Sequence, residues 1–157
     1  MRVLQVCLLV CAVAGPFAVT AGAQASGIGS QARAAGTVVV AQVEELRPRF
    51  ERNSHGDQLI VSDVYLRVEE AWKGAAAHSL IITTVEGGTV GALSLQVSDM
   101  PALKNGDRAV LFLDAQGPGR YALRNRGRGI MKLTPTDRVE GSQVTLAEVR
   151  RAAGAGR

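Results

Sequence analysis

Apolar and polar positions alternate most regularly between residues 60 and 70. One parity there is apolar and the other polar, a pattern typical of a half-buried antiparallel strand. The apolar parity holds Val64, Leu66 and Val68, and the polar parity holds Asp63, Tyr65, Arg67 and Glu69. Trp72 continues the apolar parity, so we expect it to anchor the core.

Other β-branched or apolar runs predict further strands. Residues 37–43 form the first, which can continue toward Phe50 if Pro48 lies at a sheet edge or a bulge. Residues 80–85 are apolar on both parities, so we expect this strand to be covered on both faces. The remaining strands are expected at residues 93–97, 109–113, 121–123 and 130–133.

The chain changes to a helical pattern near its C-terminus. Thr145 and Glu148 have the spacing of a capping box, in which each side chain accepts a hydrogen bond from a free amide at the helix start. Short strands with turns about every 8–12 residues are typical of a small barrel or sandwich. We therefore predict an all-β fold over residues 36–145, followed by a short C-terminal helix and tail over residues 146–157.

The first 25 residues match a secretory signal peptide. Arg2 precedes an apolar stretch that ends at Gly15-Pro16, and small residues follow this break. The small-x-small pattern predicts cleavage after Ala23 or Ala25, because the peptidase pocket admits only short side chains. We therefore expect an exported protein, either periplasmic or secreted.

An uncleaved membrane anchor is the alternative, because residues 3–23 carry no charge and are long enough to span a bilayer. The Gly-Pro break and the small residues after it favour cleavage. Residues 26–35 are small and polar, so we expect a flexible spacer there. No later apolar run is long enough for a membrane span.

Removal of the signal changes what the composition implies. Both cysteines, Cys7 and Cys11, lie in it, which excludes a disulfide framework, a thiolate zinc site and a cysteine nucleophile from the mature chain. Without Arg2 the chain keeps 17 basic and 14 acidic residues, a net charge of +3 that is too small to steer partners strongly. Aromatic residues make up only 4% of the chain, which disfavours base stacking and hence a nucleic-acid partner.

Several short segments together resemble known proteins. They are the run 38–43, the segment 68–74, the pair Gly87-Gly88, the segment 106–113 and Tyr121. In this order they resemble a group of uncharacterised exported bacterial proteins. More distantly, they are similar to the netrin-like domain, which includes the tissue inhibitors of metalloproteinases. The resemblance covers residues 36–133 and implies an OB-fold barrel with an extracytoplasmic binding role.

The inhibitor mechanism does not follow from this resemblance. Those inhibitors chelate a protease zinc through an N-terminal cysteine held by disulfides, whereas this mature chain has no cysteine. We therefore predict a small OB-like (netrin-like) barrel without the inhibitory wedge.

The sequence offers little for catalytic or metal chemistry. His55 and His78 lack the spacing of zinc ligands, and no G-x-S-x-G elbow is present. The acidic pairs at 44–45 and 69–70 point to opposite faces of their strands, so neither forms a dyad. We predict no metal, cofactor or catalytic residue; an enzyme would need perturbed acids such as Glu86 or Asp99.

A basic cluster near the end of the strand region is the strongest candidate binding site. Its members with shared parity would project from one face of an extended segment, and guanidinium groups bind carboxylates, phosphates or anionic glycans bidentately. Tyr65 with Arg67 offers a second exposed pair. The candidate ligand-binding residues are Tyr65, Arg67, Tyr121, Arg124, Arg126 and Arg128, with Arg120 and Lys132 nearby. A solvated surface loop is the alternative for the cluster.

These features favour a monomeric, non-enzymatic binding module for a protein partner in the periplasm or outside the cell. The alternative is a module that binds an anionic glycan or envelope polymer through the arginine cluster. An enzyme is the third possibility. The dependence of binding on salt distinguishes the first two possibilities, since the affinity for a polyanion falls as the salt concentration rises.

Overall fold

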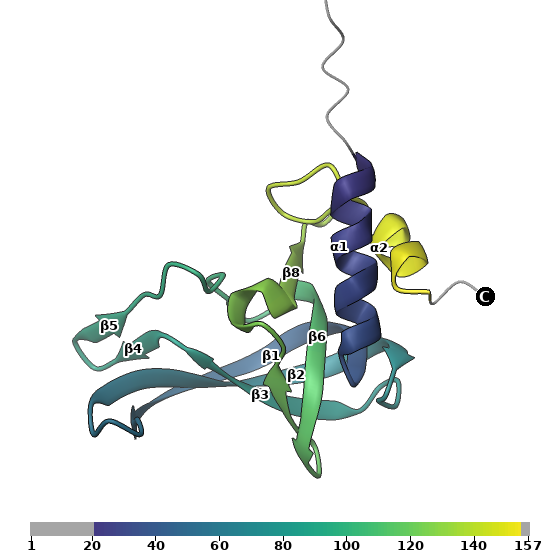
Figure 1. Cartoon of the computed structure of the whole chain (residues 1–157). Helices are drawn as coiled ribbons and strands as arrows, with labels where there is room; N and C mark the ends of the chain where they lie inside the picture. Colours follow the sequence, from purple (N-terminus) through teal and green to yellow (C-terminus); the bar gives the residue numbers. More distant parts are fainter. Residues whose placement is uncertain (1–20, 155–157) are drawn as a thin grey trace, which may run out of the picture.

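Five strands close into a barrel in the computed structural model, which describes residues 21–154 (Figure 1). The sheet order is β1-β2-β3-β7-β6, and β6 pairs back to β1 to close the barrel. Among the described strands, only β3 and β7 pair in parallel. The strands are β1 (Thr37–Arg52), β2 (Gln58–Lys73), β3 (Leu80–Glu86), β6 (Arg108–Gly117) and β7 (Arg120–Leu123). This confirms the all-β fold as a small OB-like barrel; the netrin-like relationship stays a prediction.

Shorter elements surround the barrel. A hairpin of β4 and β5 projects from one end, and β8 pairs with residues 108–111 of β6, next to the part of β6 that pairs with β7 (Figure 1). The run expected at 93–97 therefore adds a strand to this hairpin and not to the barrel. The elements are α1 (Ala21–Ala34), β4 (Gly88–Val90), β5 (Leu93–Leu95), η1 (Arg126–Gly129, a 3-10 turn), β8 (Ile130–Leu133) and α2 (Leu146–Ala152).

The barrel interior holds the parity that the sequence predicts. Val64, Leu66 and Val68 of β2 are fully buried there, beside Val39 of β1 and Leu111 of β6. Their opposite-parity neighbours face outward, so β2 has the predicted half-buried character. Burial of these aliphatic side chains removes apolar surface from water and stabilises the closed barrel.

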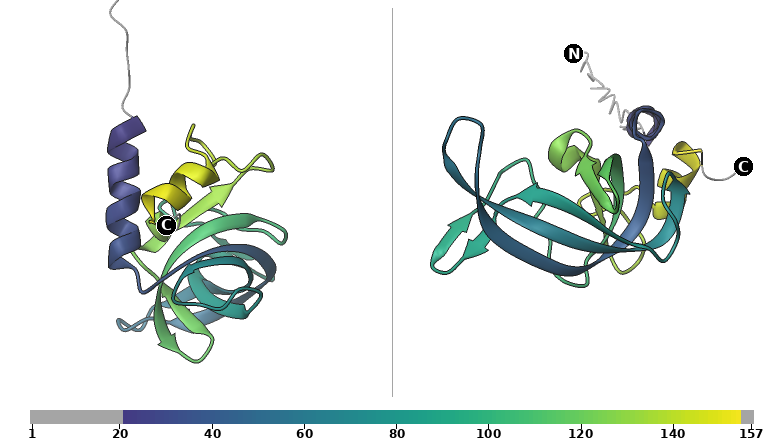
Figure 2. Two further views of the ribbon diagram at one scale, coloured as in Figure 1. Left: turned by 90° about the vertical axis from the view of Figure 1, so that its right-hand side faces the viewer. Right: turned by 90° about the horizontal axis from the view of Figure 1, so that it is seen from below.

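A second core lies outside the barrel wall, beneath α1 and α2 (Figure 2). The outer parity of β1 and β6 contributes Val40, Val110 and Phe112, all fully buried. This explains why both strands are apolar at consecutive positions, because each has one face in the barrel and the other under a helix. Val149 of α2 is fully buried in the same core, and the capping box of Thr145 and Glu148 is present as expected.

The segment expected to be a flexible spacer, residues 26–35, is instead helical as far as Ala34. Its Ile28 and Ala32 are buried in the second core. A Cβ on Gly29 would lie 3.0 Å from the carbonyl oxygen of Ala152, so the missing side chain lets α1 approach α2 closely. The glycines and serines of this segment disfavour a helix, and here docking supplies the stability that their helix propensity does not.

Lys73 of β2 satisfies the C-terminal end of α1. Its Nζ donates to the carbonyl oxygens of Ala32 and Arg33 at 3.4 and 3.2 Å, and also to that of Ala35. A cation at this end complements the helix dipole and the free carbonyls of the last turn. The expected signal peptide lies largely within residues 1–20, outside the described residues, and the two expected cleavage positions fall in the first turns of α1. Among residues 21–154, no helix is long and apolar enough to cross a membrane.

Trp72 belongs to the second core and not to the barrel interior, contrary to the parity expectation. Register shifts between β1 and β2 let Ala71 take the inward position opposite Val39, which turns Trp72 to the outer side. A bulge breaks the period of two, so parity cannot be carried through it. The half-buried indole donates from Nε1 to Glu70 at 3.0 Å, and Arg150 of α2 lies 5.7 Å from its ring centre.

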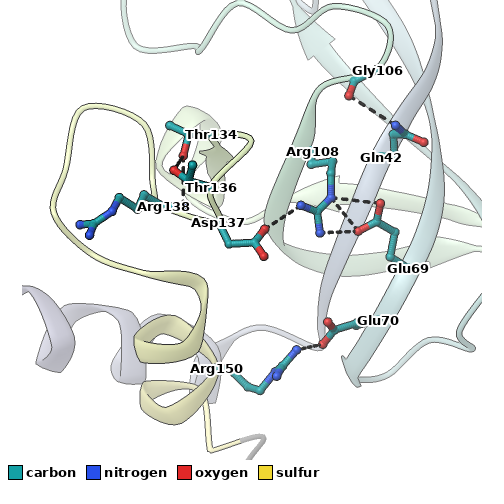
Figure 3. Close-up of polar contacts among 10 residues, drawn as sticks. All are labelled: Gln42, Glu69, Glu70, Gly106, Arg108, Thr134, Thr136, Asp137, Arg138 and Arg150. Atoms are coloured by element: carbon teal, nitrogen blue, oxygen red, sulfur yellow. Dashed lines mark hydrogen bonds and ion pairs between the residues drawn. The ribbon is translucent and has the colours of Figure 1, made fainter.

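Glu70 connects this part of β2 to α2. It accepts from Trp72 and also pairs with Arg150 (Figure 3), and these hydrogen bonds hold the pKa of its carboxyl below the ordinary value. A lowered pKa stabilises the fold at pH values above the unfolded pKa, and the contribution is lost as the pH falls through the folded value.

We predict that Glu70→Gln is less stable than the wild type at pH 7, and that the difference shrinks as the pH falls below 4.5, the ordinary glutamate value. Thermal unfolding of both chains between pH 7 and pH 3 measures this. A difference that stays constant over the whole range would show that the carboxylate charge is not what links β2 to α2.

Candidate functional site

The outer surface of β3, and of the parts of β1 and β2 around residues 45–47 and 63–67, lies away from the helices, which cover Val40 of β1 and Trp72 of β2. Cross-strand pairing places Tyr65 between Glu45 and Ile82, and Ile82 beside Arg120 of β7. Arg67 lies opposite Leu80 in the next row. We call this surface the outer β1–β3 face; it comprises Arg47, Asp63, Tyr65, Arg67, Leu80, Ile82, Thr84 and Arg120.

Tyr65 is held at the centre of the face by Arg47. The Arg47 Nη1 donates to the Tyr65 hydroxyl at 3.0 Å, and its guanidinium carbon lies 4.4 Å from the ring centre. Glu45 in turn accepts from Nε and Nη2 of Arg47, both at 2.8 Å. The hydrogen bonds from Arg47 lower the pKa of the exposed Glu45 carboxyl. An aromatic ring ordered in this way is preorganised for contact with a partner.

Asp63 and Arg67 continue the charged border. Burial raises the pKa of Asp63, but hydrogen bonds from Arg49 at 3.2 Å and from the Thr84 hydroxyl at 2.7 Å outweigh it, so the net shift is downward. Arg67 pairs with Glu44. From the sequence we expected Tyr65 to form a pair with Arg67. In the structure, the arginine that stacks on Tyr65 is Arg47.

Apolar side chains lie between these charges. Leu80 is 47% exposed, and Ile82 is half-buried beside Tyr65. We expected both faces of β3 to be covered. Only the face inside the barrel is covered in this way. No helix of the described residues packs on its outer parity.

The arginine cluster does not form the single basic face that the sequence predicted. Its central part is not extended, because Asn125 and Arg126 have left-handed backbone angles and η1 follows. Arg126 points to two acids, with Nη2 at 2.7 Å from Glu86 and Nε at 2.9 Å from Asp99. A period of two does not apply to a turn, so the shared parity of these arginines has no structural meaning here.

Arg124 and Arg128 take different directions. The Nε of Arg124 lies 3.0 Å from Oδ2 of Asp114, but its N–H makes no well-directed hydrogen bond, so we regard the contact as an ion pair only. Arg128 is exposed, and its carbonyl oxygen accepts from Gln31 of α1 at 2.7 Å. Tyr121 is also separate, because it is partly buried against the barrel interior and does not lie beside the arginines on the surface.

Several acidic side chains pair with arginines of the chain, and Arg108 and Arg126 each hold two acids. Arg108 bonds Glu69 at 2.9 Å and Asp137 at 2.7 Å, contacts that raise its pKa, whereas neighbouring Glu70 pairs with Arg150 (Figure 3). Glu86 and Asp99, the acids an enzyme could have used, share Arg126. Among residues 21–154, no group of three or more potential metal ligands comes together.

Comparison with protein-family models and with curated proteins finds no match. The geometry alone therefore supports the outer β1–β3 face as the candidate site. Tyr65 and Arg67, two of the six candidate residues, lie on it, whereas the other four lie elsewhere. Sequence reasoning missed Arg47, Leu80 and Ile82, and it assigned Arg120 to the arginine cluster and not to this face. The two-sided apolar pattern of β3 was the signal that could have identified Leu80 and Ile82.

Proposed function

We propose that the chain is an exported, non-enzymatic binding module that engages a protein partner through the outer β1–β3 face. One observation carries this proposal: the strand β3 is apolar on both parities, yet on the outside Leu80 is 47% exposed and Ile82 is only half-buried. A strand with this pattern is ordinarily buried on both faces. A protein partner would supply the missing cover.

The chemistry of the face suits a protein surface. Tyrosine and arginine are enriched at the energetically dominant positions of interfaces, with a polar rim around them. Here Tyr65 and Ile82 form the centre, and the ion pairs of Arg47 and Arg67 lie around them. OB-fold barrels also bind through the face of their second and third strands and the loop between strands four and five. Arg120 follows the corresponding β6–β7 turn.

An anionic glycan or envelope polymer is less well supported. A polyanion needs free cations in a row, but Arg67, Arg124 and Arg126 each contact a carboxylate of this chain. Binding would have to break these pairs. The apolar side chains at the centre of the outer β1–β3 face would contribute nothing to such a ligand.

The proposal predicts that a double variant of the apolar residues loses partner binding and that a triple variant of the arginines keeps it. Leu80→Ser with Ile82→Ser should weaken partner binding about 30-fold or more, because the loss of even one central interface side chain costs about 2 kcal/mol or more. Arg124, Arg126 and Arg128 replaced together by alanine should leave it within about threefold. Both variants are compared with the wild type in low and high salt against partners isolated from the envelope.

Thr89→Asp, on the exposed part of β4, is the matched control for a polar change at a strand surface. Thermal unfolding must show that each variant folds. Loss of binding in the arginine variant, with steep weakening by salt, would support the polymer and overturn the proposal.

A further inference from the structure

A pocket of about 630 Å³ lies on the other side of the molecule, between α1, the start of β8 and the loop 139–144. In Figure 1 this loop curves over β8 beside α1. The walls of the pocket are largely apolar. The volume of the pocket falls within the range of about 300–1,000 Å³ that is typical of small-molecule sites. The apolar walls are Ile28, Ile130, Met131, Val139 and Val144.

One cation lies at this pocket. Arg128 is exposed and lines it, while its backbone is fixed by the hydrogen bond from Gln31, which lines it too. The ion pairs of Arg124 and Arg126 hold those two side chains elsewhere, but the described residues provide no carboxylate within ion-pair distance of Arg128. No acid is among the described lining residues. An uncompensated guanidinium beside an apolar surface complements an anionic head on an apolar body.

We propose that this site, the α1 pocket, binds a single-chain fatty-acid carboxylate. The alkyl chain lies against the apolar walls, and the carboxylate pairs with Arg128. A single free cation fits one anionic head and not a polyanion, and the site lies apart from the outer β1–β3 face. The proposal therefore adds a small-molecule ligand to the partner-binding role and does not depend on it.

Saturated carboxylates from octanoate to dodecanoate, used as monomers below their micelle concentrations, are the probe for calorimetric titration of the purified chain. Affinity should rise about fourfold with each methylene, the effect of burying one CH₂. The matched alcohols should bind at least about tenfold more weakly, because they lack the charge-assisted hydrogen bonds to Arg128. Arg128→Ala should remove this preference for carboxylate, and Arg128→Lys should restore part of it.

Gly27→Leu tests the location of the ligand. A Cβ on this pocket-lining residue meets nothing within 4 Å, so the larger side chain enters open space and also favours the helix. Binding should fall at least tenfold while the melting temperature stays unchanged or rises. Ser30→Leu is the matched control, since it adds the same side chain to an exposed position of α1 that does not line the pocket.

Three results would overturn the proposal. They are no binding of any monomeric carboxylate, equal binding in Gly27→Leu and the wild type, and an unchanged carboxylate preference in Arg128→Ala. Binding to phosphatidylglycerol vesicles without binding to the monomers would also overturn it, because it would indicate attraction to a charged membrane surface.

Discussion

Replacement of Phe112 by alanine should lower the free energy of unfolding by about 3–5 kcal/mol, the usual cost of removing a buried phenylalanine. Phe112 is fully buried in the second core, between the barrel wall and the two helices. A loss of this size is a large part of the total stability of a small domain, about 5–15 kcal/mol. Urea unfolding followed by circular dichroism measures it.

Leu111→Ala is the matched comparison, because Leu111 is equally buried but faces the barrel interior. We expect about 2–5 kcal/mol there. Hydrogen exchange should distinguish the two variants: Phe112→Ala accelerates exchange in α1 and α2, and Leu111→Ala accelerates it in the barrel strands. Loss of less than about 1 kcal/mol in Phe112→Ala would contradict a second core.

Gly127→Ala should have the second large effect, at least about 3 kcal/mol, which is at the upper end for overpacking. Gly127 is buried in η1, and an added Cβ would lie 1.6 Å from the carbonyl oxygen of Asp99 and 3.0 Å from Cα of Met100. Backbone cannot rotate away as a side chain can. The segment around residues 99–100 must therefore separate from η1, or the fold must lose stability.

Gly117→Ala provides the control, because its Cβ would meet nothing within 4 Å. We expect a change within about 0.5 kcal/mol, as for ordinary surface positions. The two alanine variants are compared by urea unfolding and by exchange in residues 96–103. Similar small changes in both would contradict the close packing of η1 against this segment.

The sequence predicted the barrel strands well because burial on one face imposes a period of two. The alternation at Val64 and Leu66, and the continuous apolar run from Ala109 to Leu113, were confirmed. The capping box of α2 was confirmed because it depends on local spacing alone. Each of these signals lies within a few residues of the chain.

The errors arose where contacts over long sequence distances decide the structure. Docking against Ala152 makes a helix of a segment whose glycines and serines predict a loop. A bulge shifts Trp72 to the other side of β2. Left-handed residues at Asn125 and Arg126 separate arginines that share parity. None of these features is encoded in a repeating pattern.

The candidate site was predicted only in part, again because contacts between distant parts of the chain decide it. Tyr65 and Arg67 follow from the outward parity of β2. The closeness of Arg47 and Arg120 to them depends on the register with β1 and on the parallel pairing of β3 with β7. A single sequence contains no evidence of strand order. The two-sided apolar pattern of residues 80–85 was visible, but its meaning required the knowledge that nothing in residues 21–154 covers Leu80.

Site-specific photo-crosslinking in the living cell tests whether a protein covers the outer β1–β3 face. A benzophenone amino acid is placed at Ile82, or at Ala147 on the exposed side of α2 as the control. We expect a discrete protein adduct from position 82 that is lost with Leu80→Ser and absent from position 147. Equal adducts from both positions, or none from position 82, would contradict the proposal.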